Sequence, residues 1–168
     1  MKYRDLLQEY LASREWTDEL AVDEENSAVQ LDTGVSIGEQ RGRLIVEASD
    51  QSDFVDVFFY LSGVTCKQAK FGEMTKLFNG IHQWMRYGRF ELLDDGTIRW
   101  FHRVDFEGSS PTATSIHRIV QPGWELVVRW ADPISAVALT KQTAEEALEE
   151  FFEEQRKQEE ENSGPTEL

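Results

Sequence analysis

The stretch from Tyr87 to Phe106, "YGRFELLDDGTIRWFHRVDF", predicts a β-hairpin, and the register of that hairpin decides which side of the sheet is apolar. A two-residue turn at Asp95-Gly96 would set apolar residues opposite charged ones. A three-residue loop at 94–96, with Gly96 left-handed at a bulge, keeps one face apolar. A slip of one residue would turn that face to the wrong side. The favoured register points the following residues the same way: Phe90, Leu92, Ile98, Trp100, Val104 and Phe106.

The charged residues of the hairpin have a structural explanation. The favoured register sets Glu91 opposite Arg99, which is an opposite-charge cross-strand pair. Asp94 and Asp95 belong to the turn, and they lack the alternating carboxylates of a calcium loop. We therefore predict a structural pair of strands here rather than a reactive site.

Hydrophobic periodicity predicts the remaining elements. Alternation with period two predicts three strands upstream of the hairpin, and helical period predicts four helices. The strands are expected at residues 28–37, 43–49 and 53–62, and a polar, acidic linker at 17–27 precedes them. The helices are expected at residues 3–11, at 71–86, from Ser110-Pro111 onward, and after a capping box at Thr143–Glu146.

The third of these helices is uncertain in its middle, because Pro122 and Gly123 interrupt it. A proline inside a helix removes one backbone hydrogen bond and kinks or restarts the helix. Residues 124–130 alternate like a strand but also fit a buried helix, so periodicity leaves both options open. Asp132-Pro133 reads as another helix start.

The order α-β-β-β-α-β-β-α(-α) predicts an α+β fold with an antiparallel sheet of about five strands and flanking helices. The chain has 168 residues and is 40% hydrophobic, which is enough for one sizeable core. We expect a single domain at 1–156 and a disordered acidic tail at 157–168, because the tail has no apolar face.

The net charge of −15 argues against nucleic acid and anionic membranes as partners, because binding to phosphate groups needs a basic surface. No apolar run approaches the roughly 20 residues of a membrane span. The N-terminal residues lack an apolar core of signal-peptide length. These features predict a cytoplasmic protein.

Few residues suggest catalysis. Cys66 is the only cysteine, which excludes an internal disulfide and a cysteine-based zinc site. His82, His102 and His117 show no helical metal-pair spacing, and no nucleophile-elbow or phosphate-loop motif is present. We predict no enzyme activity, no cofactor and no metal. The alternative is a small-molecule or metal-dependent enzyme, or a ligand-binding sensor domain, that uses these histidines.

Surplus apolar residues predict a homodimer. The region from Ile116 to Trp130 points apolar side chains to several sides, and a twofold contact would bury the surplus. The expected interface residues are Ile116, Ile119, Val120, Trp124, Val127 and Val128.

The chain resembles the YbjN family, bacterial proteins often described as sensory transduction regulators, and its order of elements is similar to the type III secretion chaperone-like fold. The resemblance covers residues near 1 to 152. It rests on "MTKLFNGIHQWMRYGRFEL" (74–92), on the hairpin through "DDGTIRWFHRV" (94–104), and on "ADPISAV" and "TAEEAL" (131–137, 143–148).

The resemblance implies a strongly twisted antiparallel sheet and a small, acidic, usually homodimeric protein without catalytic residues. Secretion chaperones of this fold hold an extended segment of a partner against apolar surface. The expected function is therefore a non-enzymatic, cytosolic protein-binding module, chaperone- or adaptor-like, with a regulatory role as one option. The sequence does not identify the partner, the pathway or the regulating signal.

Overall fold

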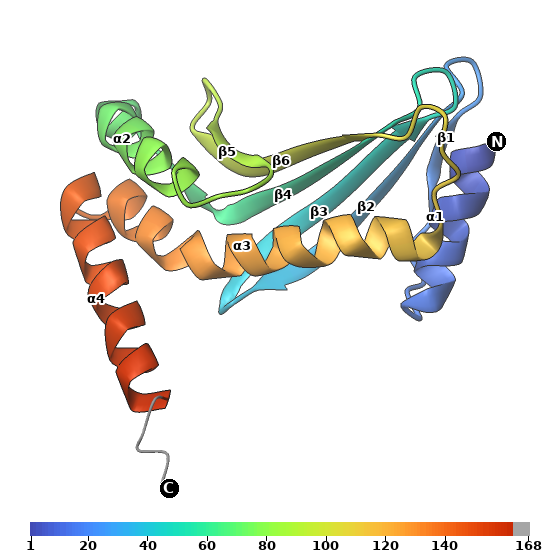
Figure 1. Ribbon diagram of the computed structural model, residues 1–168. Helices are drawn as coiled ribbons and strands as arrows, with labels where there is room; N and C mark the ends of the chain where they lie inside the picture. The colour runs from blue at the N-terminus through green and yellow to red at the C-terminus, as the bar shows by residue number, and fades with distance from the viewer. Residues whose placement is uncertain (163–168) are drawn as a thin grey trace, which may run out of the picture.

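The computed structural model describes residues 1–162 and confirms the α+β class (Figure 1). Its elements, in chain order, are α1 (Lys2–Ser13), β1 (Ala21–Asp23), β2 (Ala28–Ile37), β3 (Gln40–Ser49), β4 (Phe54–Thr65), a 3₁₀ helix η1 (Gln68–Lys70), α2 (Phe71–His82), β5 (Arg89–Leu92), β6 (Thr97–Asp105), α3 (Ala113–Leu139) and α4 (Ala144–Asn162).

The strands form one antiparallel sheet in the order β1-β2-β3-β4-β6-β5, which is one strand more than the sequence predicts. The additional strand, β1, lies in the segment read as a polar linker. Its three residues are all exposed, so no alternation marks them, and only their pairing with residues 28–30 of β2 defines the strand. A short edge strand of this kind has no signal in hydrophobic periodicity.

The hairpin of β5 and β6 has the predicted register. Phe90 lies opposite Trp100, and Leu92 lies opposite Ile98. Gly96 has a φ of +85°, the left-handed conformation that the three-residue loop requires. The loop is also tied to the end of β4, because the amide of Cys66 donates a hydrogen bond of 2.9 Å to the carbonyl of Gly96.

The core lies between the sheet and helices α1 and α3, which lie across one face of the sheet (Figure 1). Trp100 of β6 is fully buried at its centre. A Cβ atom on Gly88 would overlap the indole of Trp100, and one on Gly123 would come within 2.6 Å of it. The tryptophan therefore fills a slot that two glycines leave open, and α3 can approach the sheet closely there.

α3 is continuous through both prolines, so residues 124–130 are helical and Asp132-Pro133 is not a helix start. Its buried residues recur at helical spacing on both sides of Pro122. The prolines remove the helical partners of the carbonyls of Arg118 and Arg129, which lie on the exposed side, where water can serve them. Burial of the apolar face thus outweighs the interruption that Pro122 predicts.

The start of α3 lies two residues later than Ser110-Pro111 predicts. Thr112 is the N-cap, and its hydroxyl accepts a hydrogen bond of 3.2 Å from the amide of Ser115. The Ser115 hydroxyl in turn accepts one from the amide of Thr112 at 3.1 Å. This reciprocal pair is a capping box with serine at the third position, where glutamate or glutamine is usual.

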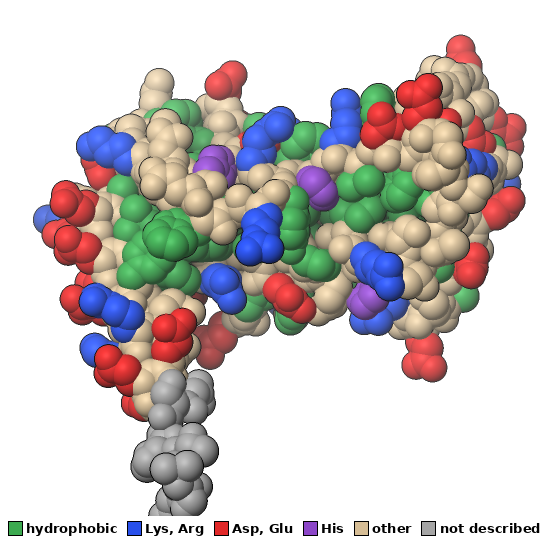
Figure 2. All heavy atoms as spheres, in the orientation of Figure 1, with side chains coloured by type: hydrophobic (Ala, Val, Ile, Leu, Met, Phe, Trp, Pro, Cys, Tyr) green, Lys and Arg blue, Asp and Glu red, His purple; other side chains and the backbone are tan. Residues whose placement is uncertain are grey.

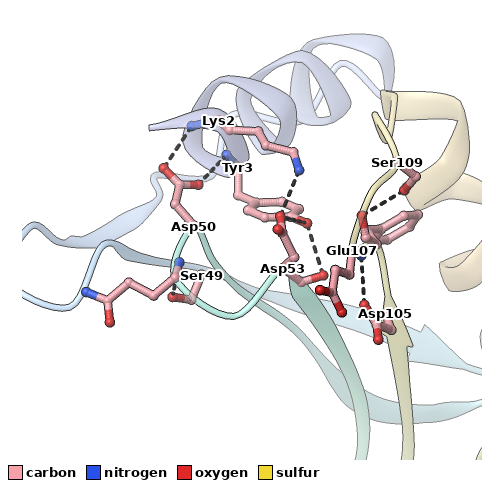
Figure 3. Close-up of polar contacts among 10 residues, drawn as sticks. Lys2, Tyr3, Ser49, Asp50, Asp53, Asp105, Glu107 and Ser109 are labelled. Carbon is pink, nitrogen blue, oxygen red and sulfur yellow. Dashed lines mark hydrogen bonds and ion pairs between the residues drawn. The ribbon is translucent and has the colours of Figure 1, made fainter.

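α1 begins against the turn between β3 and β4 (Figure 3). The carboxylate of Asp50 accepts hydrogen bonds of 3.0 Å from the amides of Lys2 and Tyr3. Met1, the N-cap residue, provides no side-chain cap. Asp53 adds an ion pair of 2.8 Å with the Lys2 ammonium and accepts from the Tyr3 hydroxyl at 3.2 Å. A turn distant in sequence therefore satisfies the first amides of α1 and fixes where the helix lies.

α4 starts at the predicted capping box, in which the Glu146 carboxylate accepts from the amide of Thr143 and the Thr143 hydroxyl accepts from the amide of Glu146. The helix extends to Asn162, so residues 157–162, expected in a disordered tail, are helical. Residues 163–168 lie outside the described residues. None of the helices in residues 1–162 combines the length and the apolar character that crossing a bilayer requires.

The face of the sheet opposite α1 and α3 has aromatic residues covered by arginines. Phe58 stacks on Phe101 with ring centroids 4.9 Å apart, and the Arg99 guanidinium lies 4.8 Å from the Phe58 centroid. Arg89 covers Phe101 at the same distance. These cation–π contacts shield apolar rings while the charged groups stay at the surface.

The turn at Gly96 generates a stability prediction. An alanine Cβ at this position would overlap the carbonyl oxygen of Cys66, in addition to the strain of a left-handed backbone. We expect Gly96→Ala to lower the free energy of unfolding by about 2 kcal/mol or more in urea titrations. Gly108→Ala is the matched control, because Gly108 has a φ of +70° and open space around it. Equal losses in the two variants would contradict the contact with Cys66.

Candidate protein-binding groove

A groove of about 690 Å³ lies between the end of α1, the edge of the sheet at β2, and the middle of α3. Leu44 of β3 and Phe59 of β4 contribute apolar side chains to it from the sheet. The remaining residues that line it are Tyr10, Arg14, Glu15, Trp16, Thr17, Asp18, Thr33, Gly34, Val35, Ser36, Val120, Gln121 and Trp124.

The first wall of the groove depends on how α1 ends. Glu15 has a φ of +57°, and the amide of Trp16 donates back to the carbonyl of Leu11 at 3.0 Å. The amide of Glu15 donates to the carbonyl of Ala12 at 3.1 Å, which completes a Schellman motif with glutamate where glycine is usual. The turn brings the Trp16 ring to Tyr10 with an edge-on geometry and centroids 6.0 Å apart.

The opposite wall is α3, which is tied to the sheet by one tryptophan. The indole N–H of Trp124 donates a hydrogen bond of 2.8 Å to the backbone carbonyl of Ser36. Trp124 is half-buried, and its partner oxygen lies near the end of β2. The groove thus has an aromatic ring on each side, Trp16 on one and Trp124 on the other.

One edge of β2 is open along the groove. β1 pairs only with residues 28–30, whereas β2 continues to Ile37. The two-residue turn after Ile37 makes Ile37 and Gln40 a hydrogen-bonded pair, so alternate residues from there bond to β3. Gly34 and Ser36 fall between them and direct their backbone groups away from β3. The bond from Trp124 to the Ser36 carbonyl agrees with this direction.

The arrangement supports the addition of an extended peptide strand. Open amide and carbonyl groups on an edge pair readily with another chain, and pockets beside the edge can receive alternate side chains. Here the backbone of Gly34 would provide the hydrogen bonds, and the groove would receive the side chains. Gly34 has open space on its own face, since a Cβ there would meet no atom within 4 Å.

The six predicted interface residues do not form one exposed patch. Ile116, Val120 and Val127 are buried in the core of the chain itself. Ile119 lies on one flank of the buried face of α3, and Trp124 and Val128 lie on the other; all three are half-buried. Only Trp124 and Val120 line the groove. The interface itself stays a prediction, and within it the sequence pattern did not separate the core-facing residues of α3 from those at the surface.

Sequence reasoning missed Trp16 and the open edge of β2. Gly34 gave a weak signal, because a glycine inside a strand often marks a close approach by another backbone. Trp16 follows α1 without any helical or strand periodicity, so its position depends on the left-handed Glu15, which the sequence does not reveal.

The three histidines are not brought together. The ring of His82 accepts a hydrogen bond of 2.9 Å at Nε2 from the amide of Phe90. His102 lies beside Trp100 and Tyr87 in β6, and His117 lies in the first turns of α3. Within residues 1–162, no group of three metal-binding side chains is close enough to hold an ion. The histidines, purple in Figure 2, lie apart from one another.

Cys66 is buried, and its thiol contacts the carbonyl of Lys67 at 3.6 Å. Burial raises the pKa of the Cys66 thiol, which lowers the fraction of the reactive thiolate. These features favour a packing role for Cys66 over a nucleophilic one.

Comparison with known proteins supports the fold. No protein-family model matches the chain, and no curated protein matches it in sequence. The ExsC–ExsE complex resembles it with a TM-score of 0.54 at 12% identity, over 80% of this chain and 94% of that chain. The HopA1–SchA chaperone–effector complex has a TM-score of 0.49 at 13% identity, over 76% and 90%. The likeness to the ExsC–ExsE complex confirms the type III secretion chaperone-like fold, whereas membership of the YbjN family stays a prediction.

The half-buried histidines His82 and His102 predict a loss of stability in acid. Burial lowers the pKa of both His82 and His102 below the usual value of about 6.5. Protonation of Nε2 would also break the bond that His82 accepts from Phe90. A lowered pKa contributes stability that is complete above about pH 6.5 and is lost as the pH falls through the folded-state pKa.

Thermal unfolding between about pH 8 and pH 5 tests this prediction. We expect His82→Gln to lose less stability in acid than the wild type, because the glutamine oxygen can accept from Phe90 without titrating. His102→Gln measures how much of the acid-induced loss of stability comes from the His102 imidazole. An acid loss in His82→Gln as large as that of the wild type would contradict the role of His82.

Proposed function

We propose that this protein is a non-enzymatic, chaperone- or adaptor-like module that binds an extended segment of another protein. The observation that carries the proposal is the open edge of β2 at Gly34 beside a groove with aromatic walls. An added strand would pair with the backbone at this edge and place alternate side chains between Trp16 and Trp124. The ExsC–ExsE complex, a protein–protein complex that contains this fold, supports a protein as the partner.

The charge of the chain supports the same class of partner. A net charge of −15 repels nucleic acids and anionic membranes. We therefore propose that the protein binds neither of them. The groove itself is lined by charges of both signs, with Arg14 beside Glu15 and Asp18. We infer that backbone pairing and apolar side chains dominate the recognition, that the protein acts in the cytoplasm, and that binding serves a chaperone or a regulatory role.

A proline at the open edge tests strand addition directly. Gly34 directs its amide away from β3, so Gly34→Pro removes a donor that an added strand needs and leaves the ladder to β3 in place. Gly34→Ala is the matched control, because the space around Gly34 accepts a methyl group. We expect peptides selected from a random display library to bind the wild type and Gly34→Ala, and to bind Gly34→Pro at least about tenfold more weakly.

Fluorescence anisotropy with the selected peptides measures these affinities, and circular dichroism checks that Gly34→Pro is folded. Trp124→Ala is a second variant, which we expect to weaken binding through loss of one wall of the groove. The proposal is wrong if no peptide is selected, or if selected peptides bind folded Gly34→Pro as tightly as the control.

We also propose that the protein forms a homodimer through α3. The support is the half-buried apolar residues that flank the core-facing side of the helix, Ile119, Trp124 and Val128. A twofold contact would bury one such flank against itself.

Light scattering with circular dichroism tests the dimer. We expect the wild type to have the mass of two chains at micromolar concentration, and Trp124→Glu or Val128→Glu to give a folded single chain, because a charge at the contact is costly to bury. Ile119→Glu on the opposite flank identifies the side that is used. A wild type with the mass of one chain, or dimers in all three variants, would refute the α3 dimer.

A further inference from the structure

A second surface lies where α2 and α4 meet, far in sequence from the groove. Trp84, which follows α2, is 67% exposed although its ring contacts Phe152 of α4 with centroids 5.1 Å apart. Leu148 lies one turn before Phe152 and fills the space that Gly80 leaves on α2. Figure 2 shows hydrophobic side chains gathered where α2, α3 and α4 come together, with charged side chains along α4 next to them.

The inner side of this surface is closely packed. Phe151 stacks on Trp130 of α3 with centroids 4.0 Å apart, and Phe152 meets the same indole edge-on at 6.3 Å. The Glu73 carboxylate of α2 accepts from the amide of Ala144 at 3.0 Å and so holds the first turn of α4. The base of α4 is therefore fixed against α2 and α3, whereas its distal turns project away from the rest of the molecule (Figure 1).

An acidic row borders the apolar residues. Glu145, Glu149 and Glu153 are exposed and recur every four residues, so they lie along one side of α4 beside Leu148 and Phe152. Together with Arg156 these residues line a shallow groove of about 450 Å³. Lys76 of α2 acts on Glu145 and Arg156 lies in the groove, but α4 carries nine glutamates against Arg156 and Lys157, so its net charge is strongly negative.

The charge pattern of α4 conflicts with the stability of the helix itself. The last turn of α4 contains no basic residue, although the negative end of the helix dipole favours cations there. Glutamates four residues apart also repel each other. A cationic segment bound along Glu145, Glu149 and Glu153 would relieve the repulsion among these glutamates. A pattern that violates local rules is expected at sites of function.

We propose that the surface formed by Trp84, Leu148 and Phe152, with the acidic row of α4, binds a basic amphipathic segment of another protein. Apolar side chains of that segment pack on the exposed face of Trp84 and on Phe152. Its lysines or arginines pair with Glu145, Glu149 and Glu153. The acidic row spans about 12 Å, which corresponds to two to three turns of a helical partner. An anionic membrane is disfavoured because the surface has the same sign of charge.

Isothermal titration calorimetry with a lysine- and leucine-rich peptide of about four helical turns tests the proposal. We expect saturable binding that weakens as salt is added. Trp84→Ala should weaken it at least about tenfold, because an exposed tryptophan at the centre of a contact carries much of the binding energy. The triple change Glu145→Gln, Glu149→Gln and Glu153→Gln should weaken it similarly and reduce its dependence on salt.

The matched control removes the same charge elsewhere. Glu24→Gln, Glu25→Gln and Glu39→Gln alter exposed glutamates in turns of the sheet and should leave binding unchanged. Gly34→Pro should also leave it unchanged, which separates this surface from the β2 edge. The proposal is overturned if the peptide does not bind, if Trp84→Ala binds like the wild type, or if the control triple weakens binding as much as the α4 triple.

Discussion

The structure depends on the close approach of α3 to the sheet at Trp100. The indole is fully buried between Gly88 and Gly123, and Phe59 lies next to it on the neighbouring strand. Because α3 lies close to the sheet at Gly123, Trp124 reaches the carbonyl of Ser36, and this bond sets one wall of the groove. Further along the same helix, Trp130 is the platform on which α4 packs. The groove and the surface at α4 are thus both positioned by one helix.

The periodic parts of the fold could be predicted from the sequence, because burial of one face imposes a pattern on the residues. The range 28–37 of β2, the register at Gly96 and the capping box at Thr143 are of this kind. β1 could not be predicted, since all its residues are exposed and only pairing defines it. At Pro122 the rule that proline interrupts a helix predicted a break. The break is absent, because burial of the long apolar face of α3 outweighs the lost hydrogen bond.

The candidate site was less accessible to sequence reasoning than the fold. Its aromatic walls come from Trp16 and Trp124, which lie more than a hundred residues apart and meet only through the tertiary structure. The open edge of β2 results from the shortness of β1, which has no sequence signal. The proposal of a protein partner rests on the same geometry, since an open strand edge beside apolar walls can pair with an extended chain.

The central claim is that a partner adds a strand at the β2 edge, and backbone amide exchange measured residue by residue by NMR tests it most directly. Val35 bonds to β3, so its amide should be protected with or without a bound peptide. The amides of Gly34 and Ser36 should exchange quickly in the free protein and become protected when a selected peptide is added. Unchanged exchange at Gly34 and Ser36 in the presence of saturating peptide would contradict the account.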